Sequence, residues 1–380
     1  MKFVFIYRYF TTTGGVERTL IDKANYLVHQ GHSVALVTFE QGQHPFAFKL
    51  DERIQHYELD CRRFTLYRYP IYMRLFKLWQ MNRRFIRRWN AYVEQTKPDI
   101  VITTTNSGDF LREILTARNI TNIIVESHTA FIYDMGSKSL IRKLWLIRYI
   151  RIVKRCKMLI SLTQGDARFW REHGVNRVLV LPNPLTFYPE RINDIKKEPY
   201  RIIFAGRLDK VKRIDMLISA FALIADKHPQ WHVDIFGDGE EKERIEHFIE
   251  VQQMGEHIRL HRPTTDIYTE YKKSQMLVLS SRYEGFGLVL IEAMACGIPC
   301  VSFDCPYGPP EIIQDHYNGL LAKDGDVRDL ADKMEWLMTH DEVREQMGTN
   351  AHQFAAKYKK ESIMKDWENA YDALTDGSMA

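Results

Sequence analysis

The chain has 380 residues, 45% hydrophobic content and a net charge of +4, which is enough apolar material for two packed domains of roughly 100–200 residues each. It contains no run of about 18 apolar residues and does not begin with a signal peptide's long apolar region, which argues against a transmembrane or secreted protein. Five sparse cysteines favour the reducing cytosol over a disulfide framework, and their spacing lacks the C-x2-C pair of a zinc site.

The first predicted elements form a strand-loop-helix-strand unit of the doubly wound kind. An apolar strand over residues 2–9 precedes a glycine loop, an amphipathic helix over residues 16–31 and a second strand over residues 32–39. Gly14 and Gly15 would let the backbone approach a phosphate or a sugar closely, although a Gly-Gly pair also occurs in plain connectors. The dinucleotide fingerprint G-x-G-x-x-G is absent, which argues against a nicotinamide or flavin enzyme.

A strongly basic segment follows at residues 61–93. It holds nine Lys or Arg, nine aromatic residues and no acid, and from Pro70 onward its pattern predicts a helix with an apolar and a basic side. This composition is typical of a helix on an anionic membrane surface. Two alternatives remain open: a nucleic-acid surface, because aromatic and arginine side chains also stack on bases, and a packed helix with a solvated basic face. The arginines expected on the membrane or acceptor face are Arg83, Arg84, Arg87 and Arg88.

The charge distribution supports an anionic partner for the first half. Residues 1–185 carry 29 Lys and Arg against 15 Asp and Glu, a net charge of +14, whereas the remainder carries −10. A second segment without acids, residues 136–165, would extend the basic surface. Further strands are predicted over residues 98–103 and 122–126, and His128 follows the second of these. Binding groups of such sheets lie at the carboxyl ends of strands, but a lone histidine is often structural.

The second half begins, after a polar stretch, with a strand that ends at Gly206. Arg207 and Lys212 come just before a predicted helix, where two cations and a helix N-terminus favour binding of a diphosphate. Strands predicted over residues 233–236 and 258–260 lead to Gly237 and Arg262 in the same manner.

The most informative stretch is residues 280–299. A short buried strand leads to Glu284 and the loop Gly285-Phe286-Gly287, and a helix begins near Leu288 and carries Glu292. Backbone N–H groups at such a helix start can bind an anion. The two carboxylates lie too far apart in this arrangement to share one proton. We therefore expect them to bind separate hydroxyl groups at the two ends of an elongated polar ligand.

The string E-G-F-G-L-V-L-I-E-A-M-A-C-G-I-P at 284–299 resembles the signature of retaining glycosyltransferases of family 4, which have the GT-B fold. T-T-G-G-V-E-R at 12–18, G-R-L-x3-K at 206–212 and G-D-G at 237–239 are similar to further landmarks of this family. C-P-x-G-P-x-E-I-I at 305–313 resembles the branch that builds bacterial capsules, exopolysaccharides and lipopolysaccharides.

The resemblance implies an α/β protein of two Rossmann-like, doubly wound domains that face a central cleft. An acceptor-binding domain would span residues 1–185, joined by a last helix at about 361–380. A linker would occupy residues 186–199, and a domain that binds the nucleotide sugar would span residues 200–360.

The implied reaction transfers a hexose or N-acetylhexosamine from a nucleotide sugar, most simply a UDP-sugar, with retention of anomeric configuration. His128, Arg207, Lys212 and Glu284 would act at the reacting centre, Glu292 would bind the ribose, and no cofactor is implied. No metal is expected, because the two cations and helix dipoles can stabilise the diphosphate. The expected donor-binding residues are Gly14, Gly15, Gly206, Arg207, Lys212, Gly237, Arg262, Glu284, Gly285, Phe286, Gly287, Leu288 and Glu292.

The expected acceptor is a polyprenyl-diphosphate-linked saccharide at the inner face of the cell membrane, with the enzyme cytoplasmic and peripherally attached and no nucleic acid as partner. Two alternatives stay open: a GT-B epimerase or hydrolase of nucleotide sugars, and a non-catalytic nucleic-acid-binding protein. Asp324-Gly325-Asp326 has the form of a metal-binding D-x-D motif, but its polar surroundings favour a solvated loop.

Overall fold

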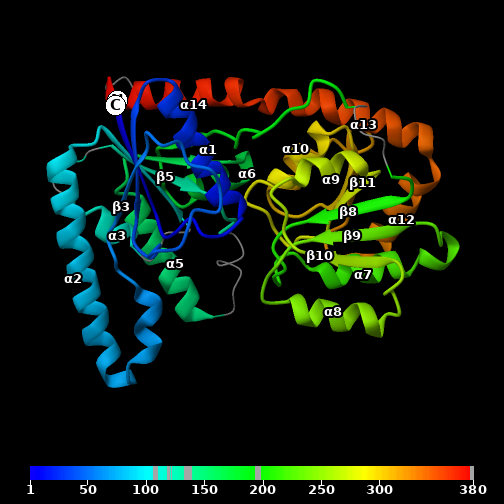
Figure 1. The fold of residues 1–380 in the computed structure, drawn as a ribbon, viewed down its shortest axis with the longest axis horizontal. Coiled ribbons are helices and arrows are strands. Elements are labelled where there is room, and N and C mark those ends of the chain that lie inside the picture. Colours follow the sequence, from blue (N-terminus) through cyan, green and yellow to red (C-terminus); the bar gives the residue numbers. More distant parts are fainter. Residues whose placement is uncertain (106–109, 118–119, 121, 132–138, 193–197, 377–380) are drawn as a thin grey trace. The chain divides into compact units, whose positions relative to one another are not determined.

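The computed structural model describes residues 1–105, 110–117, 120, 122–131, 139–192 and 198–376. It separates into two compact units, one made of Met1–Leu181 with Met364–Ala380 and the other of Pro182–Ile363 (Figure 1). The segment 186–199, expected to be a linker, thus falls within the second unit. Each unit is built around one parallel sheet, as predicted for a doubly wound fold.

The sheet of the first unit has seven strands in the order β3-β2-β1-β4-β5-β6-β7. The chain starts in the middle with β1, builds outward to β3, and then returns to the other side of β1 with β4, which is the reversal typical of this fold. Edge strand β3 was not predicted, because its sequence QHYE is mostly exposed and has no apolar pattern. The strands are β1 Lys2–Tyr7, β2 Ser33–Thr38, β3 Gln55–Glu58, β4 Ile100–Thr104, β5 Ile123–Ser127, β6 Met158–Ser161 and β7 Val178–Val180.

Helices connect these strands, and two of them begin at residues whose side chains cap the first turn. Ser139 accepts a hydrogen bond from the backbone N–H of Arg142, and Thr163 accepts one from that of Asp166. The last helix returns to the first unit, where Tyr371 packs against Phe3 of β1. The helices are α1 Gly15–His29, η1 Arg63–Arg68, α2 Ile71–Thr96, α3 Leu111–Ile114, α5 Leu140–Val153, α6 Gln164–Glu172 and α14 Lys360–Thr375.

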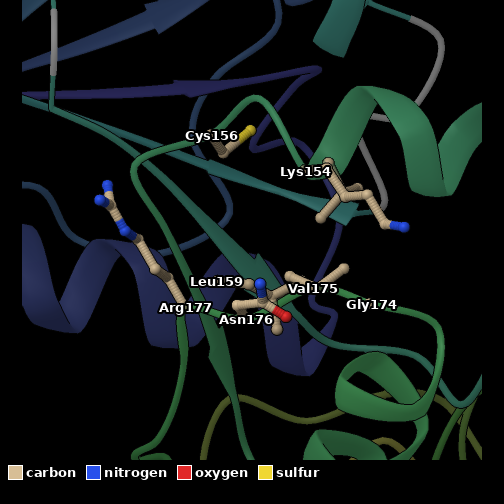
Figure 2. A pocket seen from close by; sticks show the side chains of 8 residues that line it. Lys154, Cys156, Leu159, Gly174, Val175, Asn176 and Arg177 are labelled. Atoms are coloured by element: carbon tan, nitrogen blue, oxygen red, sulfur yellow. The ribbon is translucent and has the colours of Figure 1, made fainter.

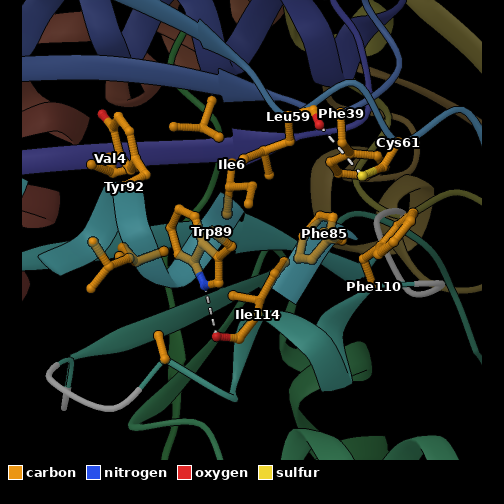
Figure 3. Close-up of a cluster of buried hydrophobic side chains, with 14 of the residues drawn as sticks. Val4, Ile6, Phe39, Leu59, Cys61, Phe85, Trp89, Tyr92, Phe110 and Ile114 are labelled. Atoms are coloured by element: carbon orange, nitrogen blue, oxygen red, sulfur yellow. Dashed lines mark hydrogen bonds between the residues drawn. The ribbon is translucent and has the colours of Figure 1, made fainter. Parts of the chain in front are cut away.

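Helix α2 confirms the helix predicted from Pro70, but its two halves have different surroundings. In the C-terminal half, Phe85 and Trp89 are fully buried in the cluster that Figure 3 shows, and Trp89 Nε1 donates a hydrogen bond to the carbonyl oxygen of Ile114 at 3.0 Å. Tyr92 is also buried. These three aromatic residues of segment 61–93 therefore belong to the core and are not available to a membrane, contrary to the expectation for the whole segment.

The second unit has six parallel strands in the order β10-β9-β8-β11-β12-β13. The strands are β8 Arg201–Ala205, β9 His232–Phe236, β10 Ile258–His261, β11 Met276–Leu279, β12 Cys300–Phe303 and β13 Gly319–Ala322. Gly319 begins β13, and a Cβ there would lie only 2.3 Å from the carbonyl oxygen of Cys300. The helices are α7 Ile214–Ala222, η3 Ala225–Lys227, α8 Lys242–Val251, α9 Ile267–Lys273, α10 Leu288–Ala295, α11 Gly308–Ile312, α12 Val327–Thr339, α13 Asp341–Ala355 and η4 Ala356–Tyr358.

The two halves of α2 predict different effects on stability. Trp89→Ala should lower the free energy of unfolding by about 3–5 kcal/mol, because it opens a large cavity in the core. Trp79→Ala on the same helix, where the side chain is 49% exposed, should change it by no more than about 0.5 kcal/mol. Urea unfolding followed by circular dichroism measures both. Similar losses in the two variants would contradict the described packing of α2.

Candidate active site

In each unit the predicted site residues follow the carboxyl ends of parallel strands. Because parallel strands end at one edge of a sheet, residues far apart in sequence meet there. In the second unit this edge holds Gly206 and Arg207 after β8, Gly237 after β9, Arg262 after β10 and Glu284 after β11. In the first unit it holds the loop of Gly14 after β1 and His128 after β5.

Lys212 and Glu284, predicted separately, form an ion pair in the second unit. Lys212 Nζ lies 2.6 Å from Glu284 Oε1, which also accepts a hydrogen bond of 2.5 Å from the Ser281 hydroxyl. The two charged side chains are only 18% and 11% exposed, so neither charge is strongly screened by water. This edge of the sheet therefore presents a cation and a carboxylate in contact, held from different loops.

Arg207 and Lys212 belong to one turn organised by Asp209. One carboxylate oxygen of Asp209 accepts hydrogen bonds from the backbone N–H groups of Val211 and Lys212, at 3.0 and 3.2 Å. The other oxygen accepts a hydrogen bond from Arg207 Nε at 2.7 Å. The Arg207 side chain is 77% exposed, so its guanidinium is accessible to a ligand while the turn fixes the position of Lys212.

Glycines allow the loops at this edge to approach one another. A Cβ on Gly237 would lie 2.1 Å from the carbonyl oxygen of Gly206, and one on Gly308 would lie 1.7 Å from that of Phe286. Gly287 has a φ of +91° and forms the N-cap of α10, a conformation that other residues rarely adopt. The expected strand-loop-helix arrangement around 285–287 is thus present, and Gly308 is a contributor that the sequence had not marked for this role.

The other expected donor residues lie on or beside this framework. Glu292 is on α10 and only 3% exposed, and it accepts a hydrogen bond of 3.4 Å from the Tyr271 hydroxyl. Leu288 begins α10, and Phe286 is buried with its ring packed edge-on to Tyr358. Arg262 is exposed after β10. Glu292 is thus buried on the second turn of α10, one turn after the glycine loop.

The first unit contains a buried chain of charged side chains that ends at His128. Glu126 Oε2 lies 2.9 Å from both Lys23 Nζ and His128 Nε2. Burial lowers the pKa of Lys23 to about 8, against the opposing effect of Glu126. Burial would raise the pKa of Glu126, but the charge of Lys23 and the hydrogen bond with His128 outweigh it and hold that pKa below its usual value.

The glycine loop of the first unit lies beside a second buried carboxylate. Tyr7 donates a hydrogen bond of 3.1 Å to Glu17 Oε1, and the other oxygen of Glu17 lies 2.2 Å from where a Cβ of Gly14 would be. A side chain at residue 14 would therefore require the Glu17 carboxylate to move. Gly15 is the first residue of α1. The Glu17 carboxylate thus lies in the first turn of α1, beside the loop that was expected to approach a phosphate or a sugar.

Lys23 was not predicted as a functional residue, although the sequence contained a signal. It lies on the apolar face of α1, three residues after Leu20 and four before Leu27, where a charged side chain has to find a buried partner. That partner, Glu126, lies in β5 two residues before His128, and only the tertiary fold brings it to Lys23.

Both aspartates of the D-x-D motif form contacts within the second unit, and the cysteines are buried. Asp326 caps α12 by accepting hydrogen bonds from the backbone N–H groups of Arg328 and Asp329, and Asp324 forms an ion pair with Arg213. The five cysteines are buried and form no disulfide, and burial raises the pKa of Cys61 to about 11. Within the described ranges, no group of three or more His, Cys, Asp or Glu side chains could hold a metal ion.

A cavity of about 310 Å³ lies at the opposite edge of the first sheet. Its lining residues include Lys154, Cys156 and Arg177, which precede β6 and β7. Figure 2 shows the side chains of Lys154 and Arg177 extending away from each other. The cavity is thus at the amino ends of the strands, away from the edge that holds His128.

Large apolar side chains are exposed at the N-terminal end of the basic segment and on α5. Exposed residues of η1 and α2 are Phe64, Tyr67, Ile71, Tyr72, Leu75, Phe76 and Trp79, and those of α5 are Leu140, Ile141, Leu144, Trp145 and Ile147. We call this set the apolar surface. In Figure 1 the N-terminal part of α2 extends beyond the sheet. No helix among the described residues is long and apolar enough to cross a membrane.

The four arginines expected on the membrane or acceptor face, Arg83, Arg84, Arg87 and Arg88, lie in the middle and C-terminal half of α2. Arg84 and Arg88 approach Asp60 at 3.7 and 3.9 Å, and Arg88 also donates a hydrogen bond to the Leu59 carbonyl oxygen. The Arg83 guanidinium lies 4.5 Å from the centre of the Trp79 ring. Part of the basic charge is therefore engaged within the first unit, while Arg83, Arg84 and Arg87 remain exposed.

Two family descriptions cover nearly all of the chain. Residues 13–186 match the family described as Glycosyltransferase Family 4, and residues 190–354 match Glycosyl transferases group 1. Among curated proteins, an uncharacterized glycosyltransferase of Haemophilus influenzae is 26% identical over 94% of this chain and 96% of its own length.

Two further relatives have assigned roles in their names. The amylovoran biosynthesis glycosyltransferase AmsD of Erwinia amylovora is 26% identical, over 94% of this chain and 96% of its own. An alpha-1,4-N-acetyl-D-galactosaminyltransferase of Campylobacter jejuni, named for the acceptor GalNAc-alpha-(1->4)-GalNAc-alpha-(1->3)-diNAcBac-PP-undecaprenol, is 28% identical over 93% of this chain and 94% of its own.

Solved structures share the fold at low sequence identity. Sucrose-phosphate synthase from Thermosynechococcus elongatus has a TM-score of 0.82 at 20% identity, covering 99% of this chain and 100% of that one. Anabaena HepE, solved in complex with UDP-glucose, has a TM-score of 0.75 at 18% identity, covering 98% and 100%. The predicted fold class is confirmed, and the chain belongs to glycosyltransferase family 4, the retaining glycosyltransferases with the GT-B fold.

Proposed function

We propose that this enzyme transfers a hexose or N-acetylhexosamine from a UDP-sugar to a lipid-linked saccharide during synthesis of a bacterial surface polysaccharide. The observation that carries the proposal is the set of Arg207, Lys212 and Glu284 at one edge of the second sheet. Two cations suit a diphosphate, and a carboxylate beside them suits a sugar hydroxyl. The HepE complex with UDP-glucose supports the choice of donor.

The donor would displace the ion pair between Lys212 and Glu284. A diphosphate oxygen offers Lys212 a second anionic partner, so the ammonium would turn toward the leaving group and release Glu284 to accept a hydrogen bond from the sugar. Arg207, which is exposed, would close on the same diphosphate. Glu292 would bind the ribose hydroxyls beside the start of α10, and Arg262 would lie near the base.

Transfer breaks the bond between the anomeric carbon and the diphosphate oxygen and forms one to the acceptor hydroxyl oxygen. The diphosphate leaves with negative charge, which Arg207 and Lys212 would stabilise more strongly in the transition state than in the bound donor. No side chain of the site is placed as an obvious nucleophile. Retention therefore follows from attack on the face that the diphosphate leaves, with the acceptor proton passing to a departing phosphate oxygen.

In this proposal the first unit binds the acceptor and the second binds the donor. The acceptor would carry a polyprenyl diphosphate, in line with the PP-undecaprenol acceptor in the name of the Campylobacter relative. The apolar surface would enter the headgroup region of the inner leaflet, and the basic side chains of α2 and α5 would attract its anionic lipids. The exposed tyrosines and tryptophans suit that interfacial depth.

The role of the two cations is open to a direct test. Arg207→Ala and Lys212→Ala should each lower turnover of the UDP-sugar by about 10²–10³-fold, as does loss of a group that stabilises transition-state charge. Lys210→Ala is the control, because this neighbouring side chain is 76% exposed and 4.0 Å from Glu241. Initial rates of UDP release in the presence of a lipid-linked acceptor provide the measurement. Near-normal rates in both variants would exclude the proposed diphosphate site.

The two carboxylates should separate binding of UDP from transfer of the sugar. Glu292→Ala should weaken the affinity for UDP alone by about tenfold or more, because a hydrogen bond to a charged group contributes roughly 1.5–3 kcal/mol. Glu284→Ala should lower transfer more than UDP affinity. Isothermal titration calorimetry with UDP compares the two variants, and unchanged affinity in Glu292→Ala would rule out its contact with the ribose.

Attachment to a membrane can be tested with vesicles. Binding should require anionic lipid and weaken in high salt, because salt screens surface charges. Arg83, Arg84, Arg87 and Arg88 changed together to Ser should reduce it, and the pair Leu75→Ser and Phe76→Ser should reduce it by at least tenfold at any salt concentration. Flotation assays give both results. Equal flotation of all variants would leave the basic segment as a solvated helix face, and salt-sensitive binding to oligonucleotides instead would favour the nucleic-acid alternative.

A further inference from the structure

One arginine of the second unit connects several loops at the carboxyl edge of the sheet. Arg213 directly follows Lys212 and forms the N-cap of α7. Its guanidinium donates hydrogen bonds to the carbonyl oxygens of Ser280 and Ser281, at 3.2 and 2.7 Å, and forms an ion pair with Asp324. These partners follow β11 and β13, whereas Arg213 comes from the loop after β8. One side chain therefore spans this edge from β8 to β13.

The strand between β11 and β13 also contacts the guanidinium. The central carbon of the Arg213 guanidinium lies 4.9 Å from the centre of the ring of Phe303, the last residue of β12. The Arg213 side chain is 15% exposed, so its charge depends on partners within the protein. A guanidinium has several N–H donors in one fixed plane, which allows it to bind the Asp324 carboxylate and two carbonyl oxygens at once.

The backbone of Arg213 adopts a conformation that arginine rarely takes. Its φ is +43° and its ψ is 48°, in the left-handed region that glycine enters without strain. Arginine in this region is less favourable for folding than glycine, because its Cβ approaches the backbone. Strained residues of this kind persist where surrounding contacts fix them, and they cluster at functional sites. A strained backbone that carries a side chain with so many partners points to a use for those contacts.

Backbone contacts join the same two loops. The Arg282 N–H donates a hydrogen bond of 2.7 Å to the carbonyl oxygen of Val211. The Ser280 hydroxyl donates one of 2.7 Å to the carbonyl oxygen of Lys212. These bonds and the two from Arg213 hold the turn after β8 against the segment after β11. The relative position of the two loops is thus set by contacts on both sides of Lys212.

This junction determines where the proposed diphosphate ligand Lys212 meets Glu284. Lys212 lies in the first loop, and Ser281 and Glu284 lie in the second. Lys212 Nζ lies 2.6 Å from Glu284 Oε1, which also accepts a hydrogen bond from the Ser281 hydroxyl. A shift of the segment that Arg213 holds would move the carboxylate relative to the ammonium. Asp324 is linked to this pair through the guanidinium that it binds.

We propose that Arg213 and Asp324 are positioning residues that hold Lys212 and Glu284 in the geometry that sugar transfer requires. The inference rests on the proposed function, because it takes Lys212 to bind the diphosphate of the donor. It gives the first aspartate of the D-x-D sequence at 324–326 a role, which is to orient a guanidinium. Neither positioning residue would touch the reacting atoms.

Arg213→Gly removes the guanidinium and places at this position the residue that suits the left-handed backbone. With UDP-glucose or UDP-N-acetylglucosamine as donor, kcat should fall by about ten- to a hundredfold, because a displacement of about 1 Å at a reacting group has an effect of this size. Arg244→Ala is the control, since this arginine is 61% exposed and pairs with Asp215 and Glu241 in the same unit. It should keep near-normal turnover, and circular dichroism checks that both variants are folded.

Double variants separate positioning from a general structural effect. In a Lys212→Ala background, Arg213→Gly should lower kcat by a much smaller factor than in the wild type, because a group that it positions is already absent. Asp324→Ala should lower kcat in the wild type and have little further effect in Arg213→Gly. A general loss of structure would give the same factor in both backgrounds. Equal factors in either comparison would therefore overturn the inference, even if each single variant is impaired.

A conservative variant tests whether the planar guanidinium matters. Arg213→Lys keeps the positive charge, but one ammonium cannot reach both carbonyl oxygens and Asp324 in the same geometry, so its kcat should resemble that of Arg213→Gly. Wild-type turnover in Arg213→Lys would overturn the positioning role. Unchanged turnover in Lys212→Ala would instead contradict the proposed diphosphate site, and the inference would fail with it. A loss in Lys212→Ala without a loss in Arg213→Gly would overturn the inference alone.

Discussion

Parallel strand pairing is the constraint on which the rest of this structure depends. Each strand of both sheets pairs in the same direction as its neighbours, so every loop that leaves a carboxyl end emerges at one edge. Arg207 and Glu284 are 77 residues apart in sequence, yet β8 and β11 are adjacent and bring their loops together. The chemistry of the second unit is therefore a property of strand order, and the glycines at 237, 287 and 308 only permit the close approach that this order demands.

Strand order also explains what could and could not be predicted. The periodicity of apolar residues predicts the buried strands and the helices between them. The loops that carry Gly206, Gly237 and Glu284 could be predicted because they interrupt this periodicity. Edge strand β3 was not predicted, since its four residues are mostly exposed and have no apolar pattern. The two ion pairs, Lys212 with Glu284 and Lys23 with Glu126, were also not predicted. A sequence can show that a charged residue lies on a buried face, but it does not show which distant charged residue is its partner.

The two ion pairs differ in what surrounds them, and this suggests different uses. Lys212 and Glu284 keep partial exposure, so in the proposed reaction a diphosphate could reach the ammonium and replace the carboxylate as its partner. Lys23 and Glu126 are fully buried, and separating them would leave an uncompensated charge in an apolar interior. In the proposed reaction the first pair would be exchanged for contacts with the donor, whereas the second would stay fixed in the core of the first unit.

Helix α2 shows why composition alone could not tell which part of the basic segment is buried in the core. Nine aromatic and nine basic residues are interleaved along residues 61–93. The sequence gives no boundary between a buried and an exposed part of this segment. The boundary comes from the sheet: where α2 passes β1, Phe85 and Trp89 enter the core, and where it extends beyond the sheet, Ile71, Tyr72 and Leu75 have nothing to pack against. A helix anchored at one end by about 3–5 kcal/mol per buried aromatic residue can present the other end rigidly. The stability of the core and the exposure of the apolar residues at the start of α2 are therefore two consequences of one long helix.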